Sequence, residues 1–214
     1  MNIAILGAGN VGTALATSLT RAGHDVVIAS PEGAAEAAAA SGARIAASNV
    51  EAARDAEAIV LAVYFPVVGA IASEIADEAH GKIVIDVTNR MTFGDAGPEI
   101  DTTSSNAEEI AKLFPASHVV KAFNTVFAGH QVDPIAQGIT LDGFVAGDDA
   151  TARAAVLELA RSIGLDPVDV GPLVRARQLE ALGFLNIYLN ATRGGDWQSG
   201  WKLIGAPKAV PVAA

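Results

Sequence analysis

The sequence predicts an α/β fold of the Rossmann type, with a doubly wound, mostly parallel sheet and a short helical segment at the C-terminus. Strand-like and helix-like segments alternate along most of the 214 residues. The strand-like segments are near-continuous apolar runs, which indicates burial on both faces of a parallel sheet. A glycine-rich turn joins the first strand to the first helix, as in a βαβ unit.

The expected elements follow in chain order. Strands are expected at residues 2–6, 25–29, 44–48, 58–63, 82–87, 118–123, 143–147 and 167–171. Helices are expected at residues 11–22, at 32–42, after Pro66, and near 149–163, with a helix N-cap in the Gly-Asp-Asp run at residues 147–149. The helix at 32–42 is rich in alanine, the best helix former, and is expected to stop at Gly42.

After Gly171 the pattern changes. Residues 173–190 are expected to form one long helix, on which the apolar residues from Leu179 to Leu189 cover most of the circumference. Such a helix is expected to be buried, against the sheet or against another subunit, which favours a homodimer. We therefore divide the chain into a dinucleotide-binding Rossmann domain, residues 1–171, and a C-terminal helical segment and tail, residues 172–214.

Composition excludes several classes of function. The net charge of −10 argues against nucleic acid or an anionic membrane surface as the main partner. The chain has no cysteine, and the acidic pair at residues 148–149 lacks the partners of a metal site, so no metal is expected. The N-terminus lacks the basic stretch of a signal peptide, and the longest uncharged run, residues 58–72, is too short to span a bilayer. A cytoplasmic protein is expected.

The motif Gly7-Ala8-Gly9-Asn10-Val11-Gly12 follows the first strand and opens the first helix. In this context Gly7 permits a tight turn, Gly9 lets the backbone approach a pyrophosphate, and Gly12 lets the helix pack on the strand. The N-terminus of the helix adds free N–H groups and a partial positive charge. The motif therefore predicts dinucleotide binding.

The choice between NAD and NADP is made at the end of the second strand, where the chain has Ser30, Pro31 and Glu32. An NAD site is expected to have Asp or Glu at the position of Ser30, and an NADP site commonly has an arginine just after it, at the position of Pro31. Ser30 can donate to a 2′-phosphate or a 2′-hydroxyl, whereas Glu32 can accept from a hydroxyl and repels a phosphate. Arg21 and Arg44 are expected at the opposite edge of the sheet. The same three residues also fit a helix N-cap followed by proline, and the sequence leaves both cofactors open.

Reduction of a carbonyl needs a general acid. The candidates near strand ends are Lys121, Asn124, Asp86 and Tyr64, whereas His130 is expected to be a solvated loop residue. The residues after Gly171 are too few for the second domain that carries the catalytic lysine of β-hydroxyacid dehydrogenases. Hydride exchange between two bound redox cofactors needs mainly proximity and orientation, so no catalytic residue is assigned. A carbonyl or imine reductase using Lys121, or a non-catalytic dinucleotide sensor, are the alternatives.

Several further segments carry a resemblance to a known family. They are ILGAGNVGTALA at the N-terminus, IDVTNRMTF (85–93), SNAEEIAKLFP (105–115), VVKAFNTVFA (119–128), GFVAGDDATA (143–152) and DVGPLVRARQLEAL (169–182). With them the chain resembles the NADPH-dependent reductases of coenzyme F420 (F420H2:NADP oxidoreductases), which share this domain with the cytosolic part of STEAP metalloreductases.

The resemblance implies an NAD(P)-dependent oxidoreductase that transfers hydride between nicotinamide and a small redox co-substrate, the deazaflavin coenzyme F420 or a flavin. It implies a homodimer and a cleft at the C-terminal ends of the strands. It places Ala8, Asn10 and Val11 at the pyrophosphate, Val63, Tyr64 and Phe65 along the path from adenosine to nicotinamide, and Thr88, Asn89, Asn124, Thr125, Val126 and Phe127 around the ring slot.

The chain also departs from the family pattern. Pro31 stands where the family has an arginine for NADP, and Asn124 replaces a histidine found in some F420 reductases. Ala181 and Gly183 stand where small hydroxyl residues are expected. These departures leave the choice of NADP open, and they leave the acceptor open between F420, a free flavin and another compound. The tail at residues 194–205 either caps the ring slot or packs onto the domain.

Overall fold

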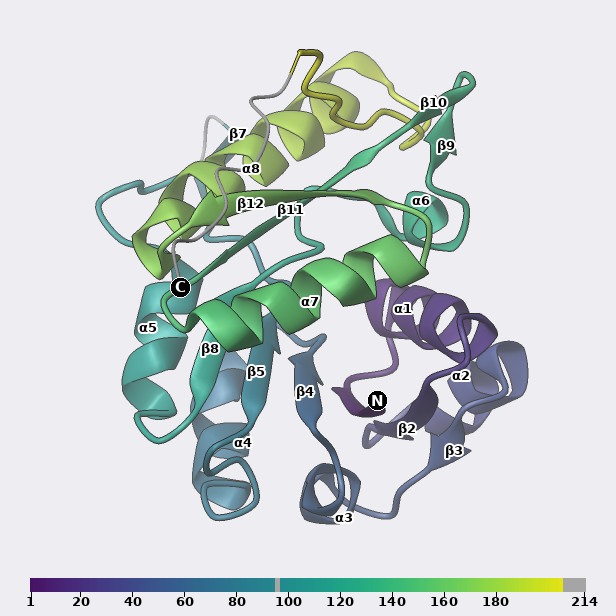
Figure 1. The fold of residues 1–214 in the computed structure, drawn as a ribbon. Helices are drawn as coiled ribbons and strands as arrows, with labels where there is room; N and C mark the ends of the chain where they lie inside the picture. The colour runs from purple at the N-terminus through teal and green to yellow at the C-terminus, as the bar shows by residue number, and fades with distance from the viewer. Residues whose placement is uncertain (95–96, 206–214) are drawn as a thin grey trace.

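A computed structural model describes residues 1–94 and 97–205 and has one eight-stranded sheet at its centre (Figure 1). The strand order is β12-β11-β8-β5-β4-β1-β2-β3. All neighbours pair in parallel except β11 and β8, which are antiparallel. The strands are β1 Asn2–Leu6, β2 Asp25–Ala29, β3 Arg44–Ile45, β4 Ala58–Leu61, β5 Ile83–Asp86, β8 His118–Lys121, β11 Asp142–Gly147 and β12 Asp166–Gly171. The predicted Rossmann-type fold is confirmed.

Helices cover both faces of this sheet. They are α1 Asn10–Arg21, α2 Ala34–Ser41, α3 Asn49–Arg54, α4 Val68–Glu74, α5 Asn106–Leu113, α6 Ala128–Val132, α7 Ala150–Ser162 and α8 Ala176–Arg193, with 3₁₀ turns η1 Phe65–Val67 and η2 Leu173–Arg175. Two small hairpins, β6 Thr92–Gly94 with β7 Gly97–Glu99 and β9 Ile135–Ala136 with β10 Ile139–Thr140, were not expected from the sequence.

Alternate residues of each central strand enter two separate apolar layers. On β1, Ile3 and Ile5 pack with α1 and α7, whereas Ala4 and Leu6 pack with α4 and α5. Figure 1 shows α7 running in front of the sheet. Burial on both faces is the reason for the unbroken apolar runs from which the parallel sheet was predicted.

The starts of two helices can be compared with the expected ones, and one of them differs. The carboxylate of Asp149 accepts a hydrogen bond of 2.7 Å from the amide of Ala152, which confirms the predicted N-cap of α7. The expected start of α2 at residue 32 is wrong, because Gly33 adopts a left-handed conformation (φ 74°) and the helix begins after it. Ser30 is therefore not the N-cap of α2.

The last helix, α8, lies at the top of Figure 1. Its inward face consists of Ala176, Leu179, Glu180, Gly183, Asn186 and Asn190. The expectation that its apolar residues are buried holds only in part, because the buried face is largely polar or small. Leu185 and Tyr188 are exposed to solvent.

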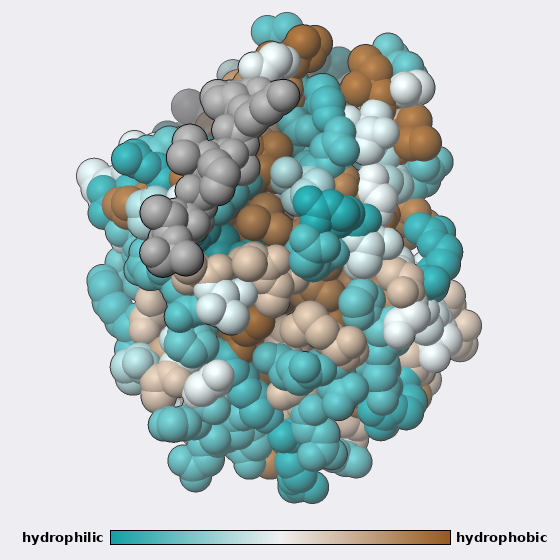
Figure 2. Space-filling model, in the orientation of Figure 1, coloured by the Kyte–Doolittle hydropathy of each residue, from teal (hydrophilic) through white to brown (hydrophobic). Residues whose placement is uncertain are grey.

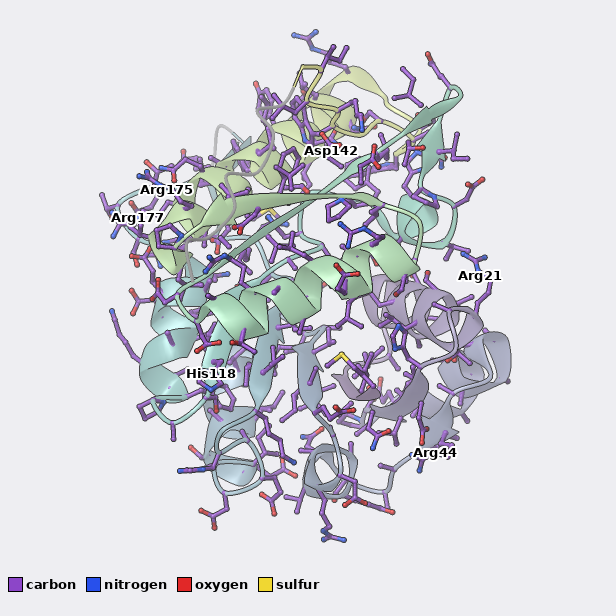
Figure 3. All side chains as sticks on the ribbon, in the orientation of Figure 1. Arg21, Arg44, His118, Asp142, Arg175 and Arg177 are labelled. Carbon is purple, nitrogen blue, oxygen red and sulfur yellow. The ribbon has the colours of Figure 1, made fainter. Side chains whose placement is uncertain are left out.

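The segment at residues 194–205 is held against the rest of the chain by polar contacts. The hydroxyl of Ser199 lies 2.7 Å from Nδ2 of Asn190, and Trp201 O accepts from the amide of Asp142 at 3.0 Å. Lys202 Nζ lies 2.9 Å from a carboxylate oxygen of Asp142, which Figure 3 labels near this segment. On the face drawn in Figure 2, hydrophobic residues gather in the upper half and hydrophilic ones cover most of the lower half.

None of the helices within residues 1–94 and 97–205 is both long and apolar enough to traverse a bilayer.

Candidate active site

The strand order reverses beside β1, which lies between β4 and β2. In open α/β sheets, ligands bind outside the carboxyl ends of the strands at such a switch point. The structure brings the predicted site residues to this edge after five neighbouring strands. They are Asn124, Thr125, Val126 and Phe127 after β8, Thr88 and Asn89 after β5, Val63, Tyr64 and Phe65 after β4, Gly7 to Gly12 after β1, and Ser30, Pro31 and Glu32 after β2.

Two glycines of the motif are required by close backbone packing. Gly7 has a left-handed φ of 110°, and a Cβ there would lie 2.3 Å from the carbonyl oxygen of Ala62. A Cβ on Gly12 would lie 2.1 Å from the carbonyl oxygen of Gly7. The turn after β1 is therefore in close contact with the residue that follows β4, and α1 packs directly on that turn.

Gly9 differs, because a Cβ there would have no neighbour within 4 Å. Gly9 is the N-cap of α1 and provides no capping side chain, and no acidic residue stands in the first turn. The first amide groups of α1 thus have no side-chain cap and lie at the positive end of the helix dipole. This arrangement fits a pyrophosphate laid against the backbone.

The turn after β2 packs beside the glycine loop. A Cβ on Gly33 would lie 3.5 Å from the carbonyl oxygen of Ala8, so the two turns are neighbours. Pro31 and Glu32 are exposed, and Ser30 is half-buried. Within the described ranges, no hydrogen bond or ion pair holds the carboxylate of Glu32.

The residues after β4 form the next part of the edge. Val63 is half-buried and its Cγ1 borders Gly7, where an added Cβ would lie 2.9 Å away. Tyr64 is 87% exposed, and Phe65 opens the short turn η1. An aromatic side chain this exposed has no packing role within the described chain.

The ends of β5 and β8 are joined by two asparagines. Nδ2 of Asn124 donates to Oδ1 of Asn89 at 2.8 Å and to the carbonyl oxygen of Leu179 at 2.9 Å. A Cβ on Gly183 would lie 2.5 Å from Oδ1 of Asn89, so α8 approaches this pair closely only because residue 183 is glycine. Asn124 and Gly183, two positions at which the chain departs from the family pattern, thus lie together where α8 approaches the asparagine pair.

Two buried polar atoms beside this pair have no partner within the described residues. They are Oδ1 of Asn124 and Oγ1 of Thr125. Buried polar atoms are normally hydrogen-bonded, so these atoms are available to a ligand or a water molecule. The preceding residue, Phe123, is buried with a left-handed φ of 62°, a strained conformation of the kind found at functional sites.

The expectation that Lys121 or Asp86 can act as a general acid on a substrate is wrong, because both side chains are fully buried. Lys121 Nζ lies 2.8 Å from Asp86 and 2.9 Å from Glu180, and its third donor is directed at the carbonyl oxygen of Thr88. All three ammonium protons have acceptors within the protein. Lys121 therefore has no proton to offer to a substrate in the role that the Lys121 alternative requires.

Glu180 extends this buried cluster to the rim of the site, a role that sequence reasoning missed. Its carboxylate accepts from the amides of Arg90 at 2.9 Å and Asn106 at 3.0 Å. The nearest sequence indication is the charged pair Asp86 and Lys121, each at the end of an apolar strand. The two residues are register partners in neighbouring strands.

The expectation that His130 is a solvated loop residue is also wrong, because His130 lies in α6 and is buried. Its ring nitrogens lie 2.9 Å from the carbonyl oxygen of Asp133 and 2.8 Å from that of Gln198. The histidine therefore holds the tail against α6. The tail places Trp197, 45% exposed, edge-on to Phe127, with ring centroids 5.2 Å apart.

Several known proteins are similar to this chain in sequence and fold. The family model described as NADP oxidoreductase coenzyme F420-dependent matches residues 2–90. The F420-dependent NADP reductase of Methanothermobacter marburgensis is 32% identical over 210 residues, which cover 89% of this chain and 92% of that protein. A solved structure of a putative F420-dependent NADP-reductase from Arthrobacter sp. FB24 superposes with a TM-score of 0.82 at 32% identity, covering 91% of this chain and 96% of that one.

Metalloreductase STEAP3 of Rattus norvegicus is 35% identical over 185 residues. The match covers 84% of this chain but 36% of that protein. The chain thus spans about a third of the length of this relative.

Proposed function

Because the chain belongs to the family of F420-dependent NADP reductases, we propose that it is an oxidoreductase that passes hydride between a nicotinamide dinucleotide and coenzyme F420. The observation that supports this most directly is the single edge that joins the glycine loop to the pair Asn89 and Asn124. A dinucleotide laid along that edge reaches from β2 toward β8. When bound, its nicotinamide supplies the hydride chemistry.

In this proposal each segment has a distinct task. The open N-terminus of α1 and Gly9 hold the pyrophosphate, and the residues after β4 line the path to the nicotinamide. The unpartnered oxygens of Asn124 and Thr125 hold polar edges of the rings, so that the two reacting carbons are kept in contact. Such positioning is the main requirement of a transfer between two bound cofactors. The buried state of Lys121 agrees with a reaction that needs no dedicated acid from the protein.

A flavin is the second candidate acceptor. The observation that favours it is the contact between Asn124 and Gly183, which replaces two residue types that the F420 reductase pattern has. A flavin and a deazaflavin share the tricyclic shape, so the same slot can hold either. Parallel assays with both acceptors separate the two cases.

We also propose that the protein acts as a homodimer through the outward face of α8. Leu185 and Tyr188 are exposed on this face, and Phe184 stacks against Tyr188 with ring centroids 6.1 Å apart. A helix that turns polar residues inward and apolar residues outward leaves apolar area in water unless a second copy covers it.

Direct transfer is tested with reduced nicotinamide that carries deuterium at the transferred position. The proposal predicts that one deuterium appears in the reduced deazaflavin, measured by mass spectrometry. Reduced deazaflavin whose new carbon-bound hydrogen comes from solvent contradicts direct transfer. Binding of dinucleotide without oxidation by either acceptor supports the sensor alternative instead.

A further inference from the structure

The turn after β2 occupies the position that distinguishes the two nicotinamide dinucleotides. In Rossmann folds an acidic residue about 20 positions beyond the glycine motif binds the ribose 2′-hydroxyl of NAD, whereas an arginine nearby accepts the 2′-phosphate of NADP. Glu32 stands twenty residues after Gly12 and three after the last residue of β2. Position 30, where an NAD site is expected to have its acidic residue, is Ser30, and Glu32 provides a carboxylate two residues further along the same turn.

No cation compensates for this carboxylate within the described part of the chain. The segments that follow β1, β2, β3 and β4 at this edge, residues 7–11, 30–33, 46–49 and 62–67, contain neither lysine nor arginine. A 2′-phosphate placed here meets a negative charge and no positive one.

The sequence predicts Arg21 and Arg44 at the opposite edge, and both side chains have partners elsewhere in the protein, although the backbone of Arg44 is the register partner of Val27 in the middle of β2. Arg44 pairs with Asp25 at 3.0 Å, and Asp25 is the first residue of β2, roughly 13 Å of strand from its end. Arg21 ends α1 and donates to the carbonyl oxygen of Val132. Figure 3 shows Arg21 and Arg44 on the right, near α1 and β3, and Arg175 and Arg177 on the left with α5 and α8.

The backbone of the turn that carries Glu32 is constrained on both sides of this residue. Pro31 restrains the backbone before Glu32, and the left-handed Gly33 after it packs on Ala8 of the glycine loop. The carboxylate is therefore carried by a short, constrained turn beside the dinucleotide site. It has no protein partner within residues 1–94 and 97–205, so its acceptor oxygens are free for a ligand.

From these observations we infer that this protein selects the dinucleotide with a free 2′-hydroxyl, NAD(H), and that Glu32 is the residue that determines this specificity. The inference rests on the proposed function, because it names the cofactor of that same site. It departs from the relatives, whose names state NADP. The residues present do not fit a 2′-phosphate.

The expected size of the preference follows from one charged hydrogen bond gained and one charge repulsion avoided. A hydrogen bond to a charged group contributes roughly ten- to a hundred-fold in affinity. NADH is therefore expected to bind at least about ten-fold more tightly than NADPH.

The test is a pair of titrations, with NADH and with NADPH, followed by the fluorescence of the reduced nicotinamide. The variants are Glu32→Gln, which removes the charge, and Glu32→Arg, which reverses it. Glu36→Gln is the matched control, because Glu36 is also exposed and lies four residues on in α2. A thermal melt of each variant shows that it is folded.

The wild type is expected to bind NADH more tightly than NADPH. Glu32→Gln is expected to reduce that preference about ten-fold, and Glu32→Arg is expected to prefer NADPH. Glu36→Gln is expected to leave the ratio of the two affinities unchanged. Preference of the wild type for NADPH, or a ratio that Glu32→Gln does not alter, overturns the inference and leaves the proposed function intact. Failure of the folded wild type to bind either dinucleotide overturns both.

Discussion

Nζ of Lys121 and Oε1 of Glu180 lie 2.9 Å apart, and neither side chain has appreciable contact with solvent. Lys121 belongs to β8 and Glu180 to α8, so this ion pair ties the last helix to the sheet beneath the candidate site. With Asp86 the cluster contains two carboxylates and one ammonium. Buried charges of this kind depend on one another, because each loses hydration that only its partners replace.

Removal of the ammonium is therefore expected to be costly. Lys121→Met leaves two buried carboxylates facing each other and is expected to lower the free energy of unfolding by about 3–5 kcal/mol. Urea denaturation measures this change. Lys112→Met is the control, because Lys112 is exposed and forms a surface pair with Glu109, for which a loss below about 0.5 kcal/mol is expected. Equal losses in the two variants contradict a structural role for Lys121.

The glycine loop predicts opposite behaviour for two of its residues. Gly9→Ala adds a methyl group to open space, so the loss of stability is expected to stay below about 1 kcal/mol, the size of an N-cap effect, while dinucleotide affinity falls by at least about ten-fold. Gly12→Ala forces a Cβ against backbone and is expected to destabilise the fold by about 1–3 kcal/mol. Gly69→Ala, in α4 with no neighbour within 4 Å, is the control for both measurements. Full dinucleotide affinity of Gly9→Ala contradicts the assigned site.

The contact of α8 with the asparagine pair is expected to affect turnover rather than dinucleotide binding. Gly183→Ala places a Cβ 2.5 Å from Oδ1 of Asn89 and displaces the hydrogen bond between Asn89 and Asn124. The turnover number with the acceptor is expected to fall by about ten-fold or more, since misplaced reacting groups slow transfer steeply. Steady-state kinetics and a dinucleotide titration measure the two effects separately. An unchanged turnover number shows that the pair does not position the acceptor.

If the outward face of α8 forms the dimer interface, a charge introduced on this face is expected to separate the two copies. Leu185→Glu is expected to convert the protein to a monomer, measured by light scattering coupled to size exclusion. Leu113→Glu provides the control, because Leu113 in α5 is 42% exposed and Leu185 is 43% exposed. If wild type and Leu185→Glu have the same mass, α8 is not the interface.

The ion pair between α5 and α8 predicts a pH-dependent contribution to stability. The hydrogen bonds from Arg177, at 2.7 and 2.8 Å, hold the pKa of Glu108 below its ordinary value of 4.5. A lowered carboxyl pKa stabilises the fold above the unfolded value, and this contribution is lost as pH falls through the folded value. The melting temperature of wild type is therefore expected to exceed that of Glu108→Gln at pH 7, and the difference is expected to shrink below about pH 4.5. A difference that persists undiminished at pH 3 contradicts this assignment.

The sheet was predictable because its signals are local. Each central strand is buried on both faces, so its apolar run is visible in sequence, and the glycine motif marks the turn after β1. The expectation that the site lies at the C-terminal ends of the strands follows from the same pattern, whereas the order of the strands comes from the structure. The two small hairpins carry no such signal, because each has strands of only two or three residues.

The roles of Lys121, His130 and α8 depend on distant partners. The sequence indicates that Lys121 is a candidate acid, whereas the structure surrounds it with Asp86 and Glu180. The sequence likewise indicates that His130 is a loop residue, whereas the tail covers it in the structure. The polar inward face of α8 arises because Asn186 and Asn190 bond to the returning tail. Such contacts join residues that the chain separates, and no periodicity predicts them.

The absorbance of oxidised coenzyme F420, followed with purified protein and excess NADH or NADPH in parallel, tests the central claim most directly. The proposed reaction predicts loss of this absorbance with matching oxidation of the nicotinamide, and no loss without protein. Tight dinucleotide binding with no loss of absorbance from either donor would contradict hydride transfer to F420.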